Sequence, residues 1–458
     1  MFQVTITSNT DRDLYMGKMT GDTFMQRFEQ QLAHQSGIHH WIIALSGGLD
    51  SMVLLELASR CLPAEQLTVL HINHQLQREA GEWQLFCARQ AELRGLAFHA
   101  ERVCLQPGSV ETAARNARYE VFEQVSSRNT CVLLAHHRDD QAETLLFRLF
   151  RGAGVRGMAA MPRQRALGEG LLFRPLLDIS RNELAEWAQE EGLCWVEDPS
   201  NRDLQYDRNF LRQQVLPLLA GRWSGVSARL QTAAGHLADA EALLEEFAQS
   251  DLQNCLAENS LQVDKLQLLS ERRQANLLRY WCRCAGVQLT AAQLDSLRTL
   301  MTVAGDRQPE LILGDRIIRR YRNRLFIEAM MSCPPWSALL VDVLAAPERY
   351  PGGRLLLKTE SAASPDLWLA GVSVRNRREG DRCHPSGRPG KSLKHLFQEA
   401  GVPPWQRDHW PVCVRGDEIV AVPGICICQS WCEAENKPPF WLDWQPAALF
   451  AGSDSGTL

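Results

Sequence analysis

An anion-binding turn is indicated by the consecutive residues Ser46-Gly47-Gly48-Leu49-Asp50-Ser51. The turn follows an apolar run, Trp41 to Leu45, and precedes a leucine-rich run with apolar residues at helical spacing. Paired glycines let backbone N–H groups approach a phosphate closely, and a helix start adds unpaired donors and a positive dipole end. The turn lacks the lysine of the pattern G-x-x-x-x-G-K-[ST], so we interpret it as a loop that holds the departing pyrophosphate of ATP.

Three side chains of this turn can add contacts of their own. Ser46 and Ser51 offer hydroxyl groups, and Asp50 can hold the Mg²⁺ that accompanies a nucleotide. The alternative is an ordinary turn in which Asp50 stabilises a helix start through the dipole. The strand and helix patterns on either side favour the nucleotide interpretation.

A second polar run spans residues 135–144 and reads Ala-His-His-Arg-Asp-Asp-Gln-Ala-Glu-Thr. Residues 130–136 predict a strand and residues 139–150 a helix, so this run lies at the carboxyl end of a strand. Asp140 and Glu143 are three residues apart and share a helix face, where two carboxylates could bind Mg²⁺ or an ammonium group. Acids favoured by the helix dipole in a first turn are the alternative explanation.

Arginines are concentrated at three places. Arg115 and Arg118 lie one helical turn apart and could clamp phosphate oxygens, although helix arginines are also common at a solvated surface. Residues 147–165 contain five arginines and no acid, around a glycine-rich stretch at 152–157 that suits either a polyanion backbone or a plain flexible loop. Residues 371–395 contain seven Lys or Arg against two acids. These patches indicate a polyanion partner, although the net charge of the chain is −5, because local positive patches matter more than the total charge.

The bulk properties exclude several classes of protein. A chain of 458 residues is expected to form two or three domains. No apolar run reaches membrane-spanning length and residues 1–20 are polar, so we expect a soluble, cytoplasmic protein without a membrane partner. The fourteen cysteines include no C-x-x-C pair and lie mostly in apolar segments, so free core thiols are favoured over zinc, iron–sulfur or thiol-relay sites.

Strand-like and helical patterns alternate through the first 212 residues. After the first strand and helix, the patterns predict a strand at 67–73, a helix at 78–93, a strand at 97–103 and a helix at 110–125. A capping box at Ser180 predicts a further helix start. The alternation predicts an α/β fold with a doubly wound parallel sheet, whose ligand crevice lies at the carboxyl ends of its strands.

The pattern changes twice further along the chain. Long amphipathic patterns with few strand signals predict a helical domain, and short β-prone runs broken by Gly and Pro then predict a small α+β C-terminal domain. The expected organisation is a polar leader at 1–20, a catalytic domain at 21–212, a helical domain at 213–325, an α+β domain at 335–445 and a tail at 446–458.

Taken together, these residues resemble the tRNA(Ile)-lysidine synthetase family, which belongs to the pyrophosphate-loop (PP-loop) ATPase superfamily. The first loop is shared across the superfamily, whereas the run at 135–144 and the arginine–glycine loop are more specific to the family. One departure is Asn73, where relatives usually carry Asp before a His. The matching segments are Ser46 to Ser51, Ala113 to Tyr119, Ala135 to Thr144, Arg151 to Gly157, Arg174 to Leu177, Glu197 to Asn201, Arg208 to Arg212, Arg375 to Asp381 and Lys391 to Gly401.

The resemblance implies a sheet of the adenine nucleotide alpha hydrolase-like type and an ATP-dependent ligase. In that family's reaction, ATP adenylates O2 of the wobble cytidine of tRNA(Ile) with a CAU anticodon, and pyrophosphate leaves. The ε-amine of lysine then attacks C2 and expels AMP. The resemblance therefore implies ATP and Mg²⁺ as cofactors and tRNA(Ile) and L-lysine as partners; it requires no protein partner and is compatible with a homodimer.

The resemblance also implies roles for single residues. Asp140 would orient Mg²⁺ or deprotonate the lysine amine, and Asp50 and Asp140 would be the Mg²⁺ ligands. Arg118 and Arg208 would stabilise charge on the α-phosphate or the adenylated base. The expected nucleotide contacts are Ser46, Gly47, Gly48, Leu49, Asp50, Ser51 and His136. The expected tRNA contacts are Arg151, Arg156, Arg375, Arg377 and Arg378.

Three rival functions are considered: two related enzymatic reactions and, from a different class, a non-catalytic RNA-binding protein. Base thiolation on tRNA is disfavoured because no C-x-x-C pair is present for sulfur relay. Amidotransfer is disfavoured because the 45 residues before the loop are too few for a glutaminase domain. A non-catalytic RNA-binding protein would not need the intact acids Asp50, Asp140 and Glu143.

Overall fold

The computed structural model describes residues 21–75, 79–103, 110–302, 309–330, 336–345, 353–359, 369–432 and 440–446. The expected leader at 1–20 and the expected tail beyond Pro446 lie outside these ranges. The chain divides into two compact units, residues 1–243 and residues 244–458.

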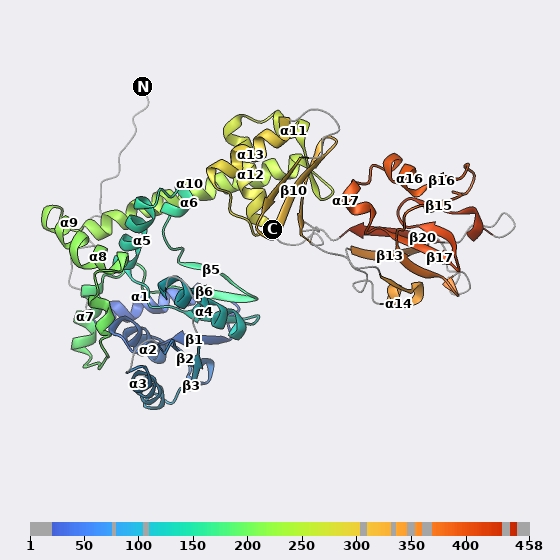
Figure 1. Ribbon diagram of the computed structural model, residues 1–458. Helices are drawn as coiled ribbons and strands as arrows, with labels where there is room; N and C mark the ends of the chain where they lie inside the picture. Colours follow the sequence, from blue (N-terminus) through green and yellow to red (C-terminus); the bar gives the residue numbers. More distant parts are fainter. Residues whose placement is uncertain are drawn as a thin grey trace, which may run out of the picture. The chain divides into compact units, whose positions relative to one another are not determined.

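The first unit is built on one sheet with the strand order β3-β2-β1-β4-β6-β5 (Figure 1). All neighbouring pairs are parallel except β5 with β6, which are antiparallel. The strand order reverses between β1 and β4, so the crevice rule for doubly wound sheets points to the carboxyl ends of these two strands. The strands are β1 (His40–Ala44), β2 (Leu67–Asn73), β3 (Ala97–Arg102), β4 (Thr130–Leu133), β5 (Gln164–Leu167) and β6 (Gly170–Phe173).

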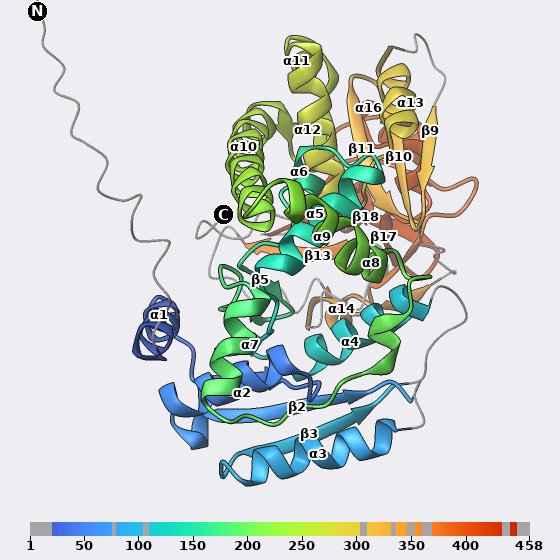
Figure 2. The same cartoon turned by 90° about the vertical axis from the view of Figure 1, so that its left-hand side faces the viewer.

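Helices cover both faces of this sheet, which confirms the predicted doubly wound α/β architecture. Buried residues of α1, α2, α3 and α7 share one core on one face, and α4 packs on the other face. Figure 2 shows α3 alongside β2 and β3. The helices of this unit include α1 (Gly21–Ala33), α2 (Leu49–Cys61), η2 (Ala64–Gln66), α3 (Ala80–Glu92), α4 (Val110–Val125), α5 (Arg138–Phe150), α6 (Val155–Met158), α7 (Arg181–Glu190), η3 (Pro199–Arg202), α8 (Asp207–Phe210), the π-helix η4 (Leu211–Val215), α9 (Leu216–Arg222) and the first part of α10 (Val226–Cys255).

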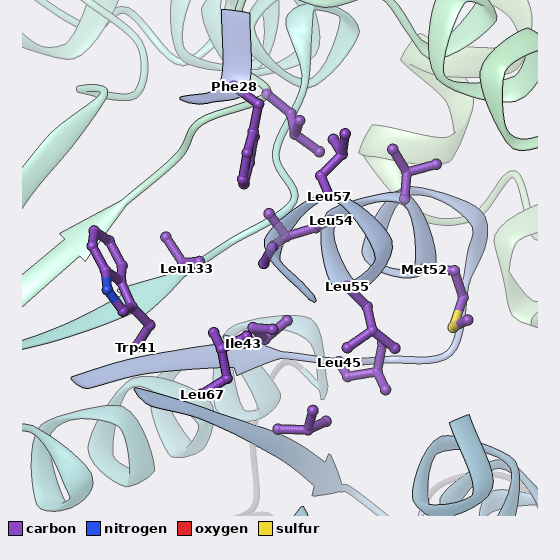
Figure 3. Packing of buried hydrophobic residues seen from close by; sticks show 14 of the residues in the cluster. Phe28, Trp41, Ile43, Leu45, Met52, Leu54, Leu55, Leu57, Leu67 and Leu133 are labelled. Atoms are coloured by element: carbon purple, nitrogen blue, oxygen red, sulfur yellow. The ribbon is translucent and has the colours of Figure 1, made fainter. Parts of the chain in front are cut away.

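Strand β1 is buried on both sides because alternate side chains enter different cores. Trp41 and Ile43 face the core shared by α1, α2 and α7, whereas Ile42 packs with Val132 and the α4 residue Phe122. Figure 3 shows the first of these cores, where side chains of α1, α2, β1, β2 and β4 meet. Burial on both faces explains why this strand is an uninterrupted apolar run.

Most predicted boundaries in this unit agree with the structure. The strand at 67–73 and the helix at 110–125 are found as predicted, and Ser180 forms the predicted capping box with Glu183. The strand predicted at 130–136 is too long, because β4 ends at Leu133. The Leu134 N–H still bonds to the Phe173 carbonyl, after which the chain leaves the sheet to begin α5. Because the strand ends at Leu133, His136 and His137 lie beyond it, at the edge of the crevice.

The second unit begins with helices that pack against a sheet. The helices are α11 (Val263–Gln267), α12 (Glu271–Cys284) and α13 (Ala291–Thr302), and they share a core with a sheet of the order β7-β8-β11-β10-β9. The strands are β7 (Leu256–Ala257), β8 (Ser260–Gln262), β9 (Glu310–Leu313), β10 (Arg316–Tyr321) and β11 (Arg324–Ala329). The region predicted as a helical domain at 213–325 therefore contains helices, as expected, and also a five-stranded sheet that was not predicted. Strands of two or three residues are too short to show a period, and β10 buries the adjacent residues Ile317 and Ile318 instead of alternating.

The remainder of the second unit is α+β, as predicted. Its main sheet has the order β12-β14-β17-β18-β19, and β13 with β20 and β15 with β16 form two smaller sheets. The β-prone runs in the sequence at 353–357, 371–374, 411–414 and 419–422 correspond to β13, β14, β17 and β18. The elements are β12 (Ser337–Leu339), α14 (Leu340–Ala345), β13 (Gly353–Thr359), β14 (Ser373–Asn376), β15 (Arg382–Cys383), β16 (Lys391–Ser392), α16 (Leu393–Glu399), α17 (Pro404–Arg407), β17 (Pro411–Arg415), β18 (Glu418–Val422), β19 (Cys426–Ile427), η6 (Gln429–Trp431) and β20 (Phe440–Pro446).

Among the helices that the structure describes, none combines the length and the apolar character needed to cross a bilayer.

Candidate active site

The turn between β1 and α2 leaves backbone donors available at a helix start. Gly48 is the N-cap of α2, and no side chain caps the helix there. Gly47 has φ of +87°, and a Cβ built on it would lie 3.0 Å from Val196 Cγ2. The Val196 N–H also donates to the Gly47 carbonyl at 2.9 Å. Glycine at position 47 is thus required by both the left-handed conformation and the close approach of the 196 segment.

The serines of the turn hold its shape. The Ser51 hydroxyl donates to the Gly48 carbonyl at 2.9 Å and lies 3.0 Å from the Ser46 hydroxyl. The Leu49 side chain points into the sheet core, so only its backbone can face a ligand. At the carboxyl end of β1 the turn therefore presents backbone N–H groups and the exposed Ser46 side chain, which is a suitable surface for phosphate oxygens.

His137 connects the two acids that were predicted to act together. It is buried at the N-cap of α5, and its Nε2 lies 3.6 Å from Asp50 Oδ2 and 3.4 Å from Asp140 Oδ2. The Asp140 carboxylate also accepts the His137 backbone N–H at 3.0 Å, which closes a capping box. The structure thus brings Asp50, from the loop after β1, and Asp140, from the loop after β4, to one histidine.

The carboxylate of Asp50 is held ionised. Burial alone would raise its pKa, but the hydrogen bond and charge of His137, with further charge from Arg181 and Arg212, lower the pKa below the ordinary value. Its Oδ1 atom is buried and has no hydrogen-bond partner among the described residues. An ionised oxygen left without a partner in a buried position is suited to a cation, so the donor set fits Mg²⁺.

Glu143 does not share a free cation site with Asp140, because Arg212 occupies both. The Arg212 guanidinium donates to both Glu143 oxygens at 2.6 and 3.0 Å and to Asp140 Oδ1 at 2.9 Å. Although burial lowers the pKa of Arg212, the charges of Glu143 and Asp140 outweigh it and raise that pKa. Arg212 lies on the π-helix η4, so this ion pair also ties the end of the sheet domain to α5.

A second group of side chains surrounds Tyr119 on α4. Arg174 is buried and donates to His136 Nδ1 at 3.3 Å, to the Tyr119 hydroxyl at 3.3 Å and to the Pro162 carbonyl at 2.7 Å. The guanidinium groups of Arg115 and Arg165 lie over the Tyr119 ring, 4.9 and 4.7 Å from its centroid. No carboxylate is paired with these arginines among the described residues, so the group carries excess positive charge.

His136 stands between this positive group and Asp140. Its pKa is lowered to about 3 by burial, and the Arg174, Arg118 and Arg115 charges oppose the favourable charge of Asp140. His136 is therefore a neutral imidazole, which can offer a hydrogen bond to a ligand but no positive charge.

Arg118 extends the positive group toward solvent, and the half-buried Arg208 lies near it. The Arg118 side chain is exposed, and Arg115 and Arg208 are its cationic neighbours. A bound anion would relieve the repulsion among these like charges. We call Arg115, Arg118, Arg174 and Arg208 the arginine cluster.

The predicted RNA contacts of the first unit have different environments. Arg156 pairs with Glu241 at 3.6 Å, and Arg151 is exposed, with its guanidinium over the Phe147 ring. Arg148, from the same arginine-rich stretch, donates to the carbonyls of Gly157 and Ala160 and so holds the glycine-rich loop. Arg151 is the better presented of the two predicted contacts.

The predicted RNA contacts of the second unit also differ from one another. Arg375 is buried in a two-bond ion pair with Asp381, at 2.8 and 2.9 Å. Arg377 pairs with Asp408 at 3.1 Å. Arg378 is exposed, and among the described residues no acid lies within ion-pair distance of its guanidinium. Arg378 is thus the best placed of the three to meet a phosphate, and Arg375 has a structural role.

The departure at Asn73 has a local explanation. Its amide NH₂ donates to Gln84 Oε1 at 3.0 Å and to the Ala80 carbonyl at 3.3 Å, while its amide oxygen accepts the Gln75 N–H at 2.9 Å. An aspartate would lack the donor for Gln84 and Ala80. Asn73 therefore serves to fix the chain after β2.

Three residues that join the site were not predicted as site residues: His137, Arg174 and Arg212. Each lies within or beside a segment that the sequence predicts to be functional, but tertiary contacts bring each side chain to the site. Only the double histidine before the acids was a sequence signal for His137, since a polar residue directly before a helix with Asp at the third position predicts a cap.

A parallel sheet with an uncapped glycine turn at its switch point, and with acids from two strand ends beside it, defines a PP-loop nucleotide-binding domain. Residues 21–219 match the ATP-binding family described as the PP-loop domain. Residues 261–326 match the TilS substrate binding domain, and residues 372–444 match the TilS substrate C-terminal domain.

Curated relatives agree over nearly the full chain. The tRNA(Ile)-lysidine synthase of Coxiella burnetii is 39% identical over 420 residues, which cover 89% of this chain and 93% of that protein. The enzyme of the same name from Methylococcus capsulatus is 41% identical, covering 90% and 98%. That from Pseudomonas syringae pv. tomato is 40% identical, covering 88% and 93%. The chain belongs to the tRNA(Ile)-lysidine synthase family, a family of ligases that form a carbon–nitrogen bond.

Proposed function

We propose that this protein joins L-lysine to C2 of the wobble cytidine of a tRNA(Ile) with a CAU anticodon, at the expense of ATP. Family membership supports the overall reaction. The observation that carries the proposal is the meeting of Asp50 and Asp140 at His137, beside an uncapped helix start. This arrangement suits a nucleotide whose pyrophosphate leaves.

In the first step, O2 of the cytosine attacks the α-phosphorus of ATP. The O2–P bond forms as the bond to pyrophosphate breaks, and the backbone N–H groups of residues 47–51 take up the charge that develops on the leaving group. A carbonyl oxygen is a weak nucleophile, so in-line positioning supplies much of the rate enhancement. The arginine cluster would hold the α-phosphate and the adenylated base, with Arg118 exposed and Arg208 half-buried beside it.

In the second step, the lysine ε-amine attacks C2 and AMP leaves with O2. The amine attacks only when neutral, so it must lose a proton. Both Asp140 oxygens already accept hydrogen bonds, one from Arg212 and one from the His137 N–H. These bonds fix the orientation of the carboxylate and occupy both of its oxygens, which favours Asp140 as an orienting group and Mg²⁺ ligand over a role as the base.

Asp50 and Asp140 would hold Mg²⁺, with Asp50 Oδ1 as the first ligand. The ion would neutralise charge on the phosphates. Asp50→Asn keeps the shape of the side chain and removes its charge, so it should abolish Mg²⁺-dependent nucleotide binding while the fold is retained.

A reconstituted reaction tests the proposal. The protein is incubated with ATP, a transcript of tRNA(Ile) with the CAU anticodon, and lysine, ammonia or a sulfur donor. We expect one AMP per lysine incorporated and a modified cytidine whose mass corresponds to lysine addition with loss of water. AMP release that does not depend on lysine, or a nucleoside that gains sulfur, would contradict the proposal.

A matched control uses the same transcript with a CAU-to-GAU anticodon change, which removes the cytidine at the wobble position. Turnover on this transcript equal to that on the first would contradict the assignment of the modified base.

A further inference from the structure

In the C-terminal α+β part of the chain, Cys383 meets two cysteines that lie more than forty residues later, Cys426 and Cys428. Cys383 lies on β15, Cys426 on β19, and Cys428 directly follows β19. Their sulfur atoms all lie within 4.8 Å of one another, and Cys383 Sγ is 3.8 Å from Cys426 Sγ. Among the described residues, no other cluster of His, Cys, Asp and Glu has its ligand atoms gathered in this way.

The sulfur spacing matches thiolates around one metal ion. Zinc–thiolate bonds of about 2.3 Å in a tetrahedron place two sulfurs about 3.8 Å apart. A disulfide requires an S–S distance of about 2.05 Å, which is much shorter than the separation found here. The geometry therefore favours metal coordination over a covalent bridge.

The backbone holds the two cysteine-bearing segments together. The Ser386 N–H donates to the Ile427 carbonyl at 2.9 Å, and the Gln429 N–H donates to the His384 carbonyl at 2.7 Å. The Cys428 N–H donates to the Val420 carbonyl at 2.8 Å. These bonds fix the positions of the thiols before any ion arrives, so little conformational entropy is lost on binding.

The cluster differs from the other buried thiols of the chain. Burial raises the pKa of Cys87 and of Cys131 to about 12, as expected for inert core thiols. In the cluster, by contrast, hydrogen bonding among the three thiols lowers the pKa of Cys426 and raises the pKa of Cys383 and of Cys428. Cys383 and Cys428 are buried, while Cys426 is half-buried and gives access from solvent.

We propose that Cys383, Cys426 and Cys428 bind one Zn²⁺ ion as thiolates and that this ion is structural. Any proton that these sulfurs still carry is released to solvent when the ion binds. Zinc in structural sites takes four ligands, so either Cys432 or a water molecule completes the tetrahedron. The Cys432 Sγ lies 3.7 Å from the Cys428 carbonyl oxygen, one helical turn beyond the cluster.

The ion would fix the start of the segment at residues 384–390, which directly follows Cys383. This segment joins β15 to β16 and carries Arg388, and β16 itself carries Lys391. Zinc at this place would thus stabilise one end of the basic stretch at 371–395. The metal site does not depend on the proposed reaction.

Metal content tests the proposal. The full chain, without a histidine tag, is produced in zinc-supplemented medium and purified under reducing conditions without chelators. Elemental mass spectrometry should give one zinc per chain, and X-ray absorption should give three or four sulfurs at about 2.3 Å. The Cys383→Ser/Cys426→Ser variant should lose at least nine-tenths of the zinc. The variant Cys194→Ser/Cys284→Ser, which removes two exposed thiols elsewhere, should keep it.

Several outcomes would overturn the proposal: wild-type protein without stoichiometric zinc after reconstitution, zinc that remains in the double variant, or absorption spectra dominated by nitrogen and oxygen. A Cys383 to Cys426 disulfide in protein alkylated at lysis would also overturn it. If the double variant fails to fold, the sulfur count of the wild-type protein decides. Cys432→Ser should lower that count by one if Cys432 is the fourth ligand and leave it at three if water is.

Discussion

Gly47 shows how one backbone position can set both the stability and the ligand affinity of the loop. Its positive φ directs the following N–H groups toward the crevice, and its missing Cβ admits the 196 segment. Gly48 has φ of −74°, and a Cβ there would lie 3.6 Å from its nearest neighbour, Ser46 Oγ, which is an ordinary contact. The backbone conformation and the close contact therefore require glycine at position 47, whereas neither requires it at position 48.

Gly47→Ala should destabilise the protein by about 1–3 kcal/mol, because alanine is strained in this conformation and its Cβ meets Val196. Gly48→Ala should change the free energy of unfolding by less than about 1 kcal/mol. Both variants should raise the KM for ATP, because the added methyl group crowds the phosphates. Chemical denaturation and steady-state kinetics measure the two effects. Equal stability losses in the two variants would refute the distinction.

Arg212→Ala should leave Glu143 as a buried charge without a partner and cost about 3 kcal/mol or more. Adding Glu143→Gln should recover part of this loss, since the amide no longer needs a counter-charge. Urea unfolding of both single variants and the double variant measures the coupling. Additive losses would show that the ion pair is not what stabilises η4 against α5.

At the scale of elements, β14 is joined to the turn after it by the ion pair of Arg375 with Asp381. Burial tends to raise the pKa of Asp381, but hydrogen bonds from Arg375 and the Arg378 N–H, and the charges of both arginines, lower it. A depressed pKa means that the ion pair contributes its full stability above the unfolded value near 3.8 and loses it as the pH falls through the folded value.

Asp381→Asn should therefore destabilise the protein at pH 7, by an amount on the order of 3 kcal/mol. The difference from the wild type should shrink as the pH falls below about 4. Denaturant unfolding between pH 3 and pH 7 measures this difference. A gap that stays constant over that range would contradict the account of Asp381.

The elements of the sheet could be predicted because their signals are local. The apolar run of β1, the glycine turn and the helical spacing of α2 lie within about twenty residues, and burial on both faces makes the strands easy to recognise. The crevice followed from the alternation of strands and helices. The sheet of the second unit could not be predicted, because β7 and β8 are too short to show a period.

The side-chain pairs of the site could not be predicted from the sequence, because they form between elements that are distant in the chain. Arg212 meets Glu143 across 69 residues, and Arg174 meets His136 across 38. The thiol cluster is a similar case, since Cys383 reaches Cys426 across 43 residues and no spacing rule covers that separation. Residue types and local order predicted which segments matter, but not which side chains pair.

At the scale of the whole molecule, a negatively charged chain must still bind tRNA through local positive patches. Arg377→Ala/Arg378→Ala should weaken tRNA binding and reduce the slope of log K against log salt by about 0.7–0.9 for each phosphate that the variant no longer neutralises. Arg378 should account for most of the change, since Arg377 already pairs with Asp408. Titrations of tRNA binding between about 50 and about 200 mM salt measure this slope.

Lys358→Ala is the matched control for that prediction, because Lys358 is exposed on β13, outside the basic stretch, and pairs with Asp443. Its slope should equal that of the wild type. Equal slopes for all three proteins would remove the basic stretch from the RNA interface.

We propose that the protein holds ATP by its departing pyrophosphate, so that a nucleobase can capture the adenylyl group. The decisive experiment is a crystal structure with Mg²⁺ and an ATP analogue whose α–β bridge cannot be cleaved. We predict β- and γ-phosphates against the backbone of residues 46–51, with Asp50 on the metal ion and the α-phosphate toward the arginine cluster. Phosphates bound elsewhere, with this loop free of them, would contradict the account.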